Sequence, residues 1–259
     1  MPSDSPATPD QSISWLERPG DDFPYYRGDP VRISGRQWWM VIAAVVIGYA
    51  VLILPPPGFR GPVSSFVPAI LFSAIPLAVL AFVAGGAWKA LFRRLRGRDF
   101  LWMIAFAVLN FVVAVVAGTI IAMLVETTAN EAVSGTGNLE GGEQLLLFAR
   151  SSIQLFGEEV MSILPFLALL YWLVSVRGMG RKGAIVIATL VVALLFAAVH
   201  LPTYGWNVVQ VVLGVGVARI VLLLPYLMTK NILVSTGAHI LNDWSSFTLA
   251  ILAAATASG

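Results

Sequence analysis

Long apolar segments separated by short polar ones fill the chain from about residue 38 onward. Each is close to the ~20 residues that an α-helix needs to cross the hydrocarbon core of a bilayer. They cover residues 38–54, 65–84, 100–125, 145–176, 184–200, 206–227 and 233–253. This pattern predicts an all-α fold, a polytopic transmembrane helical bundle of about seven spans. The long segment 145–176 would raise the count to eight if part of it is re-entrant.

The polar stretches divide the chain into four parts. Residues 1–35 contain six acidic and three basic residues among Pro and Ser, and predict a disordered or loosely ordered cytoplasmic tail. Residues 36–143 are expected to form N-terminal transmembrane helices and loops, and residues 144–253 a membrane core. Residues 254–259 form a short C-terminal end.

Composition supports the membrane assignment and excludes several kinds of site. Charged residues make up 12% of the chain and hydrophobic residues 58%, whereas about 25% charged is usual for a soluble domain. There is no cysteine, so disulfides, thiolate metal sites and cysteine nucleophiles are excluded. A formal charge of +2 is too small to indicate a nucleic-acid partner. The lipid bilayer is the expected surrounding.

The distribution of Lys and Arg predicts the orientation. Thirteen of the 16 basic residues lie in residues 1–36, in the 85–100 loop, in the 177–182 loop or at position 230, which share one side if the spans alternate. Cytoplasmic loops are enriched in Lys and Arg. We therefore expect a multi-pass integral membrane protein with its N-terminus in the cytoplasm.

Two adjacent carboxylates, Glu158 and Glu159, interrupt the apolar segment 145–176. Ionisable groups at membrane depth are costly, and so indicate a functional site. Neighbouring helical positions point about 100° apart, so one glutamate can face a reacting centre while the other anchors a neighbouring helix. Gln154 lies one turn before Glu158 on the same face. The alternative is a purely structural ion pair, for example with Arg219.

The only two histidines of the chain lie in other apolar segments. His200 ends the run that begins at Phe196. At the end of a span it could be an ordinary residue of the membrane interface. His239 lies within a span, with Asn242 and Asp243 at the third and fourth positions after it, on one helical face. A simple alternative is a His–Asp pair that locks the bundle.

Together these polar residues allow two chemistries. His200, His239 and Glu158 are a donor set that suits Zn²⁺ with an open position for water. Without metal, Glu158 could activate water while His and Asn side chains stabilise an oxyanion. Spacing alone does not choose between the two.

The order and spacing of these motifs resemble those of the CPBP family of intramembrane proteases, which includes CAAX prenyl endopeptidases and the bacterial Abi proteins. That family carries paired glutamates, then FxxxH, then HxxxN/D, each on its own transmembrane helix. Here the three motifs are Glu158-Glu159, Phe196 to His200, and His239 to Asp243. The resemblance covers residues 144–250, and implies a bacterial plasma membrane as the location.

The resemblance also implies roles for these residues. Glu158 would activate the attacking water and Glu159 would support it. His200 and His239 would bind the metal or position the water, and Asp243 would complete the site or stabilise the oxyanion. The family's first motif is usually EExxxR, but its arginine position is Ile163 here. Arg219 or Arg150 could replace that arginine from another face.

The sequence therefore predicts a metal-dependent endopeptidase that hydrolyses a peptide bond of a membrane-embedded or lipidated protein or peptide. A non-catalytic relative that uses the same cluster as a scaffold or immunity protein is the main alternative. A proton-coupled transporter, with Glu158 and both histidines as relay, is a third.

Overall fold

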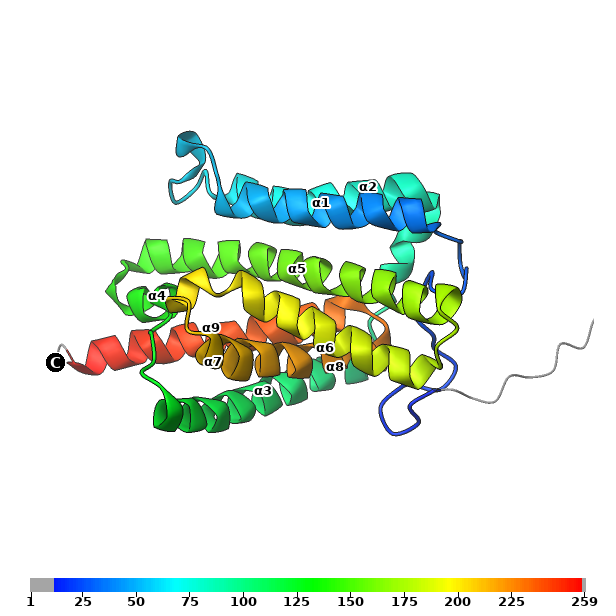
Figure 1. Ribbon diagram of the computed structural model, residues 1–259. Helices are drawn as coiled ribbons and strands as arrows, with labels where there is room; N and C mark the ends of the chain where they lie inside the picture. Colours follow the sequence, from blue (N-terminus) through cyan, green and yellow to red (C-terminus); the bar gives the residue numbers. More distant parts are fainter. Residues whose placement is uncertain (1–11, 258–259) are drawn as a thin grey trace, which may run out of the picture.

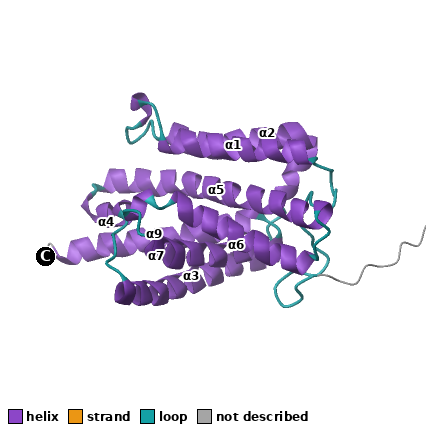
Figure 2. Cartoon of the chain, in the orientation of Figure 1, coloured by secondary structure: helices purple, strands orange, loops and turns teal. Residues whose placement is uncertain are grey.

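The computed structural model describes residues 12–257, and this part of the chain is helical with no strand (Figures 1 and 2). Seven long helical passes run roughly parallel or antiparallel to one another. They are α1 (Gly35–Ile53), α2 (Phe66–Ala84), α3 (Gly97–Leu124), α5 (Gly141–Tyr171), α6 (Arg181–Val199), α7 to α8 (Val208–Gln210 and Val217–Thr229, joined by a π-helical turn at Val211–Gly216) and α9 (Ile232–Ala257). A short helix α4 (Glu131–Ser134) precedes α5.

Six of these passes are long and apolar enough to cross a membrane. The seventh expected span, α9, falls outside that set because polar side chains, among them His239, Asn242 and Asp243, interrupt its apolar sequence. It nevertheless packs against α3, α5 and α8. The prediction of a polytopic helical bundle of about seven spans is confirmed.

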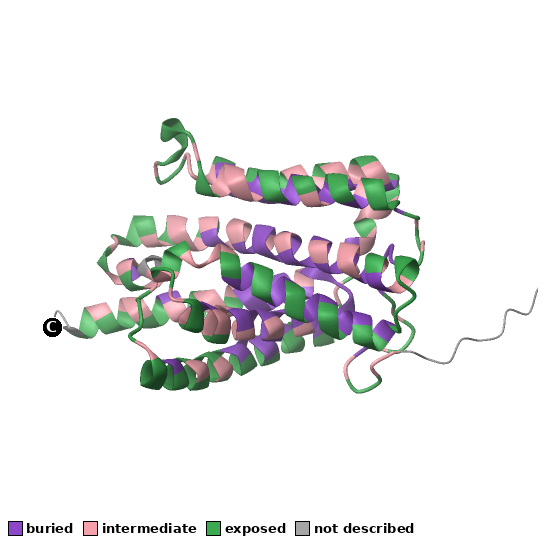
Figure 3. Cartoon of the chain, in the orientation of Figure 1, coloured by how far each residue is buried: buried purple, intermediate pink, exposed green. Residues whose placement is uncertain are grey.

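Helix α5 is the central element. The α1–α2 hairpin packs on one side of it, and α6 and α9 contact it as well (Figure 1). Its apolar side chains Val160, Ile163 and Leu167 are fully buried, and buried positions concentrate in the middle of the bundle (Figure 3). A Cβ atom at Gly157 would lie 2.4 Å from the Phe72 ring. Only glycine therefore lets α2 approach α5 this closely, directly beside the two glutamates.

The N-terminal segment differs from its prediction. Residues 1–11 lie outside the described residues, but residues 12–34 are packed against the bundle rather than loosely ordered. Phe23, Tyr25 and Tyr26 are buried in the same apolar cluster as α5. The acidic composition suggested a solvated tail, but these aromatic side chains supply enough apolar area to hold the segment on the core.

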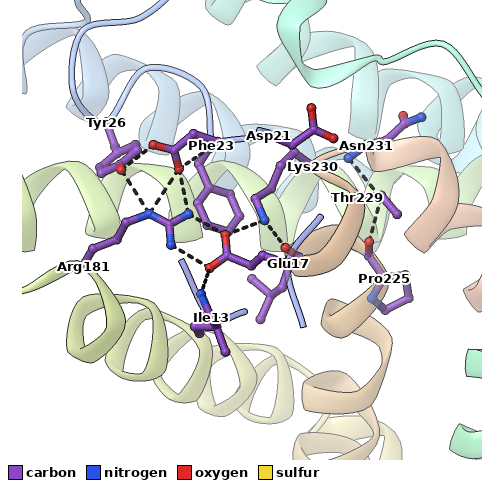
Figure 4. A network of polar contacts seen from close by, with 12 residues as sticks. Ile13, Glu17, Asp21, Phe23, Tyr26, Arg181, Pro225, Thr229, Lys230 and Asn231 are labelled. Atoms are coloured by element: carbon purple, nitrogen blue, oxygen red, sulfur yellow. Dashed lines mark hydrogen bonds and ion pairs between the residues drawn. The ribbon is translucent and has the colours of Figure 1, made fainter. Parts of the chain in front are cut away.

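A buried ionic network centred on Glu17 fastens this segment (Figure 4). The Glu17 carboxylate accepts hydrogen bonds from the Arg181 guanidinium at 2.6 Å and the Ile13 backbone N–H at 2.8 Å, and lies 2.7 Å from the Lys230 ammonium. Both cations also lie over the face of the Phe23 ring. Glu17 thus links the start of α6 to the turn between α8 and α9.

Candidate active site

The predicted site residues, apart from the buried Glu159, converge from four helices on one cavity. Helix α5 supplies the two glutamates, the end of α6 supplies His200, α8 supplies Arg219, and α9 supplies His239 and Asp243. The cavity has a volume of about 470 Å³. The predicted residues that line it are Gln154, Glu158, His200, Arg219, His239, Asn242 and Asp243.

Glu159 faces away from this cavity and is fully buried. Arg219 Nη2 donates a hydrogen bond to its Oε2 at 2.8 Å, and Nη1 lies 2.7 Å from Oε1. On the other side, His239 Nδ1 lies 2.9 Å from Glu159 Oε1. An ionised carboxylate there accepts a hydrogen bond from Nδ1–H, which leaves Nε2 with the free lone pair. Glu159 therefore joins α5 to α8 and α9 and orients His239.

Glu158 faces the cavity, and the 100° separation between neighbouring helical positions lets it do so while Glu159 points elsewhere. Gln154 Nε2 donates to Glu158 Oε1 at 3.1 Å, whereas Oε2 lies 3.9 Å from His239 Nε2. One carboxylate oxygen is thus held in place by the neighbouring turn. The other has no direct hydrogen-bond partner among the described residues and points toward the His239 ring.

His200 lies at the C-terminal cap of α6, with its Nδ1 2.7 Å from the Phe196 carbonyl oxygen. The Phe196 ring has its centroid 4.5 Å from that of His200 and 6.5 Å from that of His239. Arg219 Cζ lies 5.0 Å from the same ring centroid. Phe196 therefore packs against both imidazoles. Within the described chain, no hydrogen bond or ion pair links His200 to either glutamate.

Two side-chain amides connect Asp243 on α9 to helix α3. Its Oδ1 lies 3.8 Å from His239 Nε2 and accepts a hydrogen bond from Asn242 Nδ2 at 3.0 Å. Asn242 Oδ1 in turn accepts from Asn110 Nδ2, also at 3.0 Å. Sequence reasoning missed Asn110, although its position as the one amide within the apolar run 100–118 was a signal.

Loss of the Asn110 amide is expected to weaken the bundle. Asn110→Leu would remove the donor of the Asn242 carbonyl oxygen, which is partly buried at the cavity wall, and we expect a loss of about 1 kcal/mol. Thermal unfolding in detergent should show a lower Tm for Asn110→Leu than for Thr119→Val, an exposed substitution on the same helix. Equal Tm values would contradict the role of this amide chain.

The donor types of the site suit zinc, but their positions do not assemble a metal centre. His200 and His239 both have Nδ1 next to an oxygen acceptor, an arrangement that leaves Nε2 as the ligand nitrogen. Among the described residues, however, no group of three or more His, Cys, Asp or Glu side chains is placed to hold a metal ion. The expected set of His200, His239 and Glu158 is therefore not gathered at one point.

Ile163 occupies the position at which the family's first motif usually has an arginine. The Ile163 side chain is fully buried in the main apolar cluster, where an arginine would be an unpaired charge. The cation that meets Glu159 comes instead from Arg219 on α8. Of the two arginines that could have replaced the motif residue, only Arg219 contacts a glutamate of the pair.

A comparison with known protein families finds a match that covers these site residues. Residues 142–245 match the family described as Type II CAAX prenyl endopeptidase Rce1-like. These residues form a CAAX protease domain. The domain contains both glutamates, both histidines and Asp243, whereas Asn110 and the N-terminal segment lie outside it. No curated protein and no solved structure matched the chain.

The CAAX protease family is one of membrane endopeptidases, and the helical bundle described above agrees with an integral, multi-pass membrane location. The matched domain begins near the start of α5 and ends within α9. Helices α1 to α3 precede it, yet α2 packs against Gly157 and α3 supplies Asn110. Helix α3 therefore forms part of the cavity wall from outside the matched domain, and α2 supports α5 beside the glutamates.

Proposed function

We propose that this protein is an intramembrane endopeptidase in which Glu158 activates the attacking water. The observation that supports the proposal is that the two adjacent glutamates make different contacts. Glu159 is fully engaged by Arg219 and His239, whereas Glu158 lies at the cavity wall with one oxygen that accepts no direct hydrogen bond from a described residue. The substrate class we propose is a membrane-embedded or lipidated peptide or protein.

The chemistry follows from this geometry. Glu158 removes a proton from a water molecule in the cavity, and the water oxygen attacks the carbonyl carbon of the peptide bond. The resulting oxyanion accepts a hydrogen bond from the side-chain amide of Asn242 on α9, whose other N–H group donates to Asp243. Glu158 then returns the proton to the leaving amine, and the C–N bond breaks.

We propose zinc as the cofactor, because both histidines keep Nε2 available as a ligand nitrogen. His200 and His239 through Nε2, with Glu158, are the donors that would hold it, and because the described residues gather no three donors at one point, these side chains would have to move together to bind it. When bound it would polarise the peptide carbonyl and lower the pKa of bound water. Metal content of the purified protein tests this directly. About one zinc per chain in the wild type, lost in a His200→Ala/His239→Ala variant of matched folding, supports it, and no metal in the wild type contradicts it.

Comparing cleavage products in cell membranes tests the endopeptidase itself. Cells producing the wild type and cells producing Glu158→Gln are compared by mass spectrometry of new peptide N-termini in the membrane fraction. Glu126→Gln, an exposed loop substitution, is the control. We expect termini that are present with the wild type and the control but lost in Glu158→Gln. Identical sets in all three would favour the scaffold or immunity function.

We also propose an orientation in which the N-terminus is cytoplasmic and the cavity opens on the opposite side. Thirteen basic residues gather at the end of the bundle where α1, α3, α6 and α9 begin. The cavity instead extends to residues at the other end, among them Asn130, Tyr204 and Gln210. Segments rich in Lys and Arg remain in the cytoplasm.

Single cysteines test the orientation without background, because the chain has none of its own. Ala129→Cys and Arg98→Cys introduce exposed thiols at opposite ends of the bundle. A membrane-impermeant maleimide should label Ala129→Cys in intact cells, and Arg98→Cys only after permeabilisation. The reverse pattern would show that the cavity opens to the cytoplasm.

A further inference from the structure

A second cavity lies apart from the candidate active site, in the surface of the bundle between α1 and α6. Helix α5 contacts both of these helices and forms the floor between them (Figure 1). The cavity has a volume of about 370 Å³, and no charged side chain of the described residues lines it. None of the described residues that line it also lines the cavity beside Glu158. We refer to this second cavity as the α1–α6 groove.

In a membrane the α1–α6 groove faces lipid. Helices α1, α5 and α6 are among those long and apolar enough to cross a bilayer. Trp39, Trp172 and Leu195 line the groove and are exposed, so they lie on the outside of the bundle. At this depth the surrounding phase is hydrocarbon rather than water. The groove is therefore covered by lipid chains, and its length and the charge beside it indicate which lipid it would retain.

The α1–α6 groove spans about the depth of one leaflet. One of its ends lies at the ends of helices, because Gly35 is the first residue of α1 and Trp172 directly follows α5. The other end is at Leu195, which lies about 21 Å from the start of α6 at a rise of 1.5 Å per residue. One leaflet contributes about 15 Å of hydrocarbon in addition to its interface. The groove therefore has the length of one phospholipid chain.

The end of the groove at the membrane interface is aromatic and has cations beside it. Trp39, Tyr171 and Trp172 line this end, and Trp and Tyr side chains prefer the interface. Arg177 Cζ lies 5.5 Å from the centroid of the Trp172 ring. Arg36 lies three residues before Trp39 and so on the same side of α1. Both arginines are exposed, so their guanidinium groups can reach a lipid head group above the groove.

We propose that the α1–α6 groove retains one acyl chain of an anionic phospholipid, whose phosphate binds Arg36 and Arg177. An anionic lipid is favoured because guanidinium groups bind phosphate through paired hydrogen bonds, and no carboxylate of the described residues lines the groove to repel it. The retained lipid would connect α1 to α6 at this end of the bundle. At the other end, the Tyr49 hydroxyl connects them by donating to the Val199 carbonyl oxygen at 3.0 Å.

Native mass spectrometry of the reconstituted protein tests this inference. The wild type and its variants are placed in nanodiscs of phosphatidylcholine and phosphatidylglycerol in equal amounts, and the lipids that each protein retains are identified by mass. Ala168→Trp fills the groove from its floor, and Ala122→Trp, an exposed substitution on α3, is its control. Arg36→Gln/Arg177→Gln removes the two cations, and Arg60→Gln, exposed in the loop after α1, is the control for charge.

We expect the wild type to retain phosphatidylglycerol about tenfold over phosphatidylcholine, because two cations lie beside the head group. Ala168→Trp should lose the retained lipid, whereas Ala122→Trp should keep it. Arg36→Gln/Arg177→Gln should retain a lipid without preference for phosphatidylglycerol, whereas Arg60→Gln should keep the preference. Equal retention of the two lipids by the wild type, or undiminished retention by Ala168→Trp, would overturn the inference.

The lipid group of a lipidated substrate is the other source of an apolar chain, and a short palmitoylated peptide is therefore added in a parallel experiment. Retention of this peptide without phospholipid, abolished by Ala168→Trp, would assign the groove to the substrate and overturn the inference. If Ala168→Trp does not fold, the variant without the two arginines still decides the head-group preference. None of these measurements involves cleavage, so their outcome is independent of the role proposed for Glu158.

Discussion

Arg219→Leu is expected to lower the free energy of unfolding by about 3–5 kcal/mol, the usual cost of removing one partner from a buried ion pair. The substitution would leave the Glu159 carboxylate fully buried, with only His239 beside it. Unfolding in detergent, followed by circular dichroism, measures the change. Arg60→Leu, an exposed position, should change the free energy by less than about 0.5 kcal/mol.

A double-mutant cycle isolates the pair itself. Glu159→Gln removes the charge that Arg219 meets, so Glu159→Gln/Arg219→Leu should be more stable than the sum of the two single losses predicts. Strictly additive losses would show that the two side chains do not interact. Arg219 would then not compensate for the arginine missing at position 163.

Glu17→Gln is expected to be the second most damaging substitution, with a loss of about 3 kcal/mol. The neutral amide cannot compensate the charges of Arg181 and Lys230, both of which are buried. Asp22 still contacts Arg181 at 2.7 Å, which keeps the loss at the lower end of the range for buried pairs. Asp21→Asn, which removes a partly solvated contact with Arg93, is the control and should cost under about 1 kcal/mol.

The same carboxylate gives the wild type a specific acid sensitivity. Burial alone would raise the pKa of Glu17, but hydrogen bonds from Arg181 and Lys230 outweigh it and lower the pKa to about 2. A lowered folded-state pKa stabilises the protein fully above about pH 4.5, and this stabilisation is lost as the pH falls toward about 2. Glu17→Gln should therefore show a shallower loss of stability over this pH range. An unchanged slope would contradict the role of Glu17.

Much of the bundle follows from the sequence because a bilayer imposes length and apolarity on each span. The seven helical passes and the separation of Glu158 from Glu159 were predictable on these grounds. The packed N-terminal segment was not. Its partners Arg181 and Lys230 lie far away in the chain, and the acidic composition concealed the buried Phe23 and Tyr26.

The candidate site was predictable in its members but not in its connections. Two histidines and a glutamate pair stand out in an apolar chain, so their types and spacing identify them. Which glutamate Arg219 would meet depends on how α8 rotates against α5, and Asn110 contributes only because α3 packs on α9. Such contacts arise from helix packing, which a single sequence does not specify. The metal site could not be predicted from spacing either, because the expected ligands do not bring three donors together among the described residues.

The most direct test of the central claim compares Glu158→Gln with Glu159→Gln in the same membranes. The two substitutions are chemically identical and lie on adjacent residues, so each is a matched control for the other. Tm in detergent and new peptide N-termini in the membrane are measured for both. The structure predicts that Glu158→Gln retains a Tm close to that of the wild type and loses the cleavage products, whereas Glu159→Gln lowers the Tm by several degrees. A stable Glu159→Gln protein, or Glu158→Gln membranes that retain every cleavage product of the wild type, would contradict the proposed division of roles.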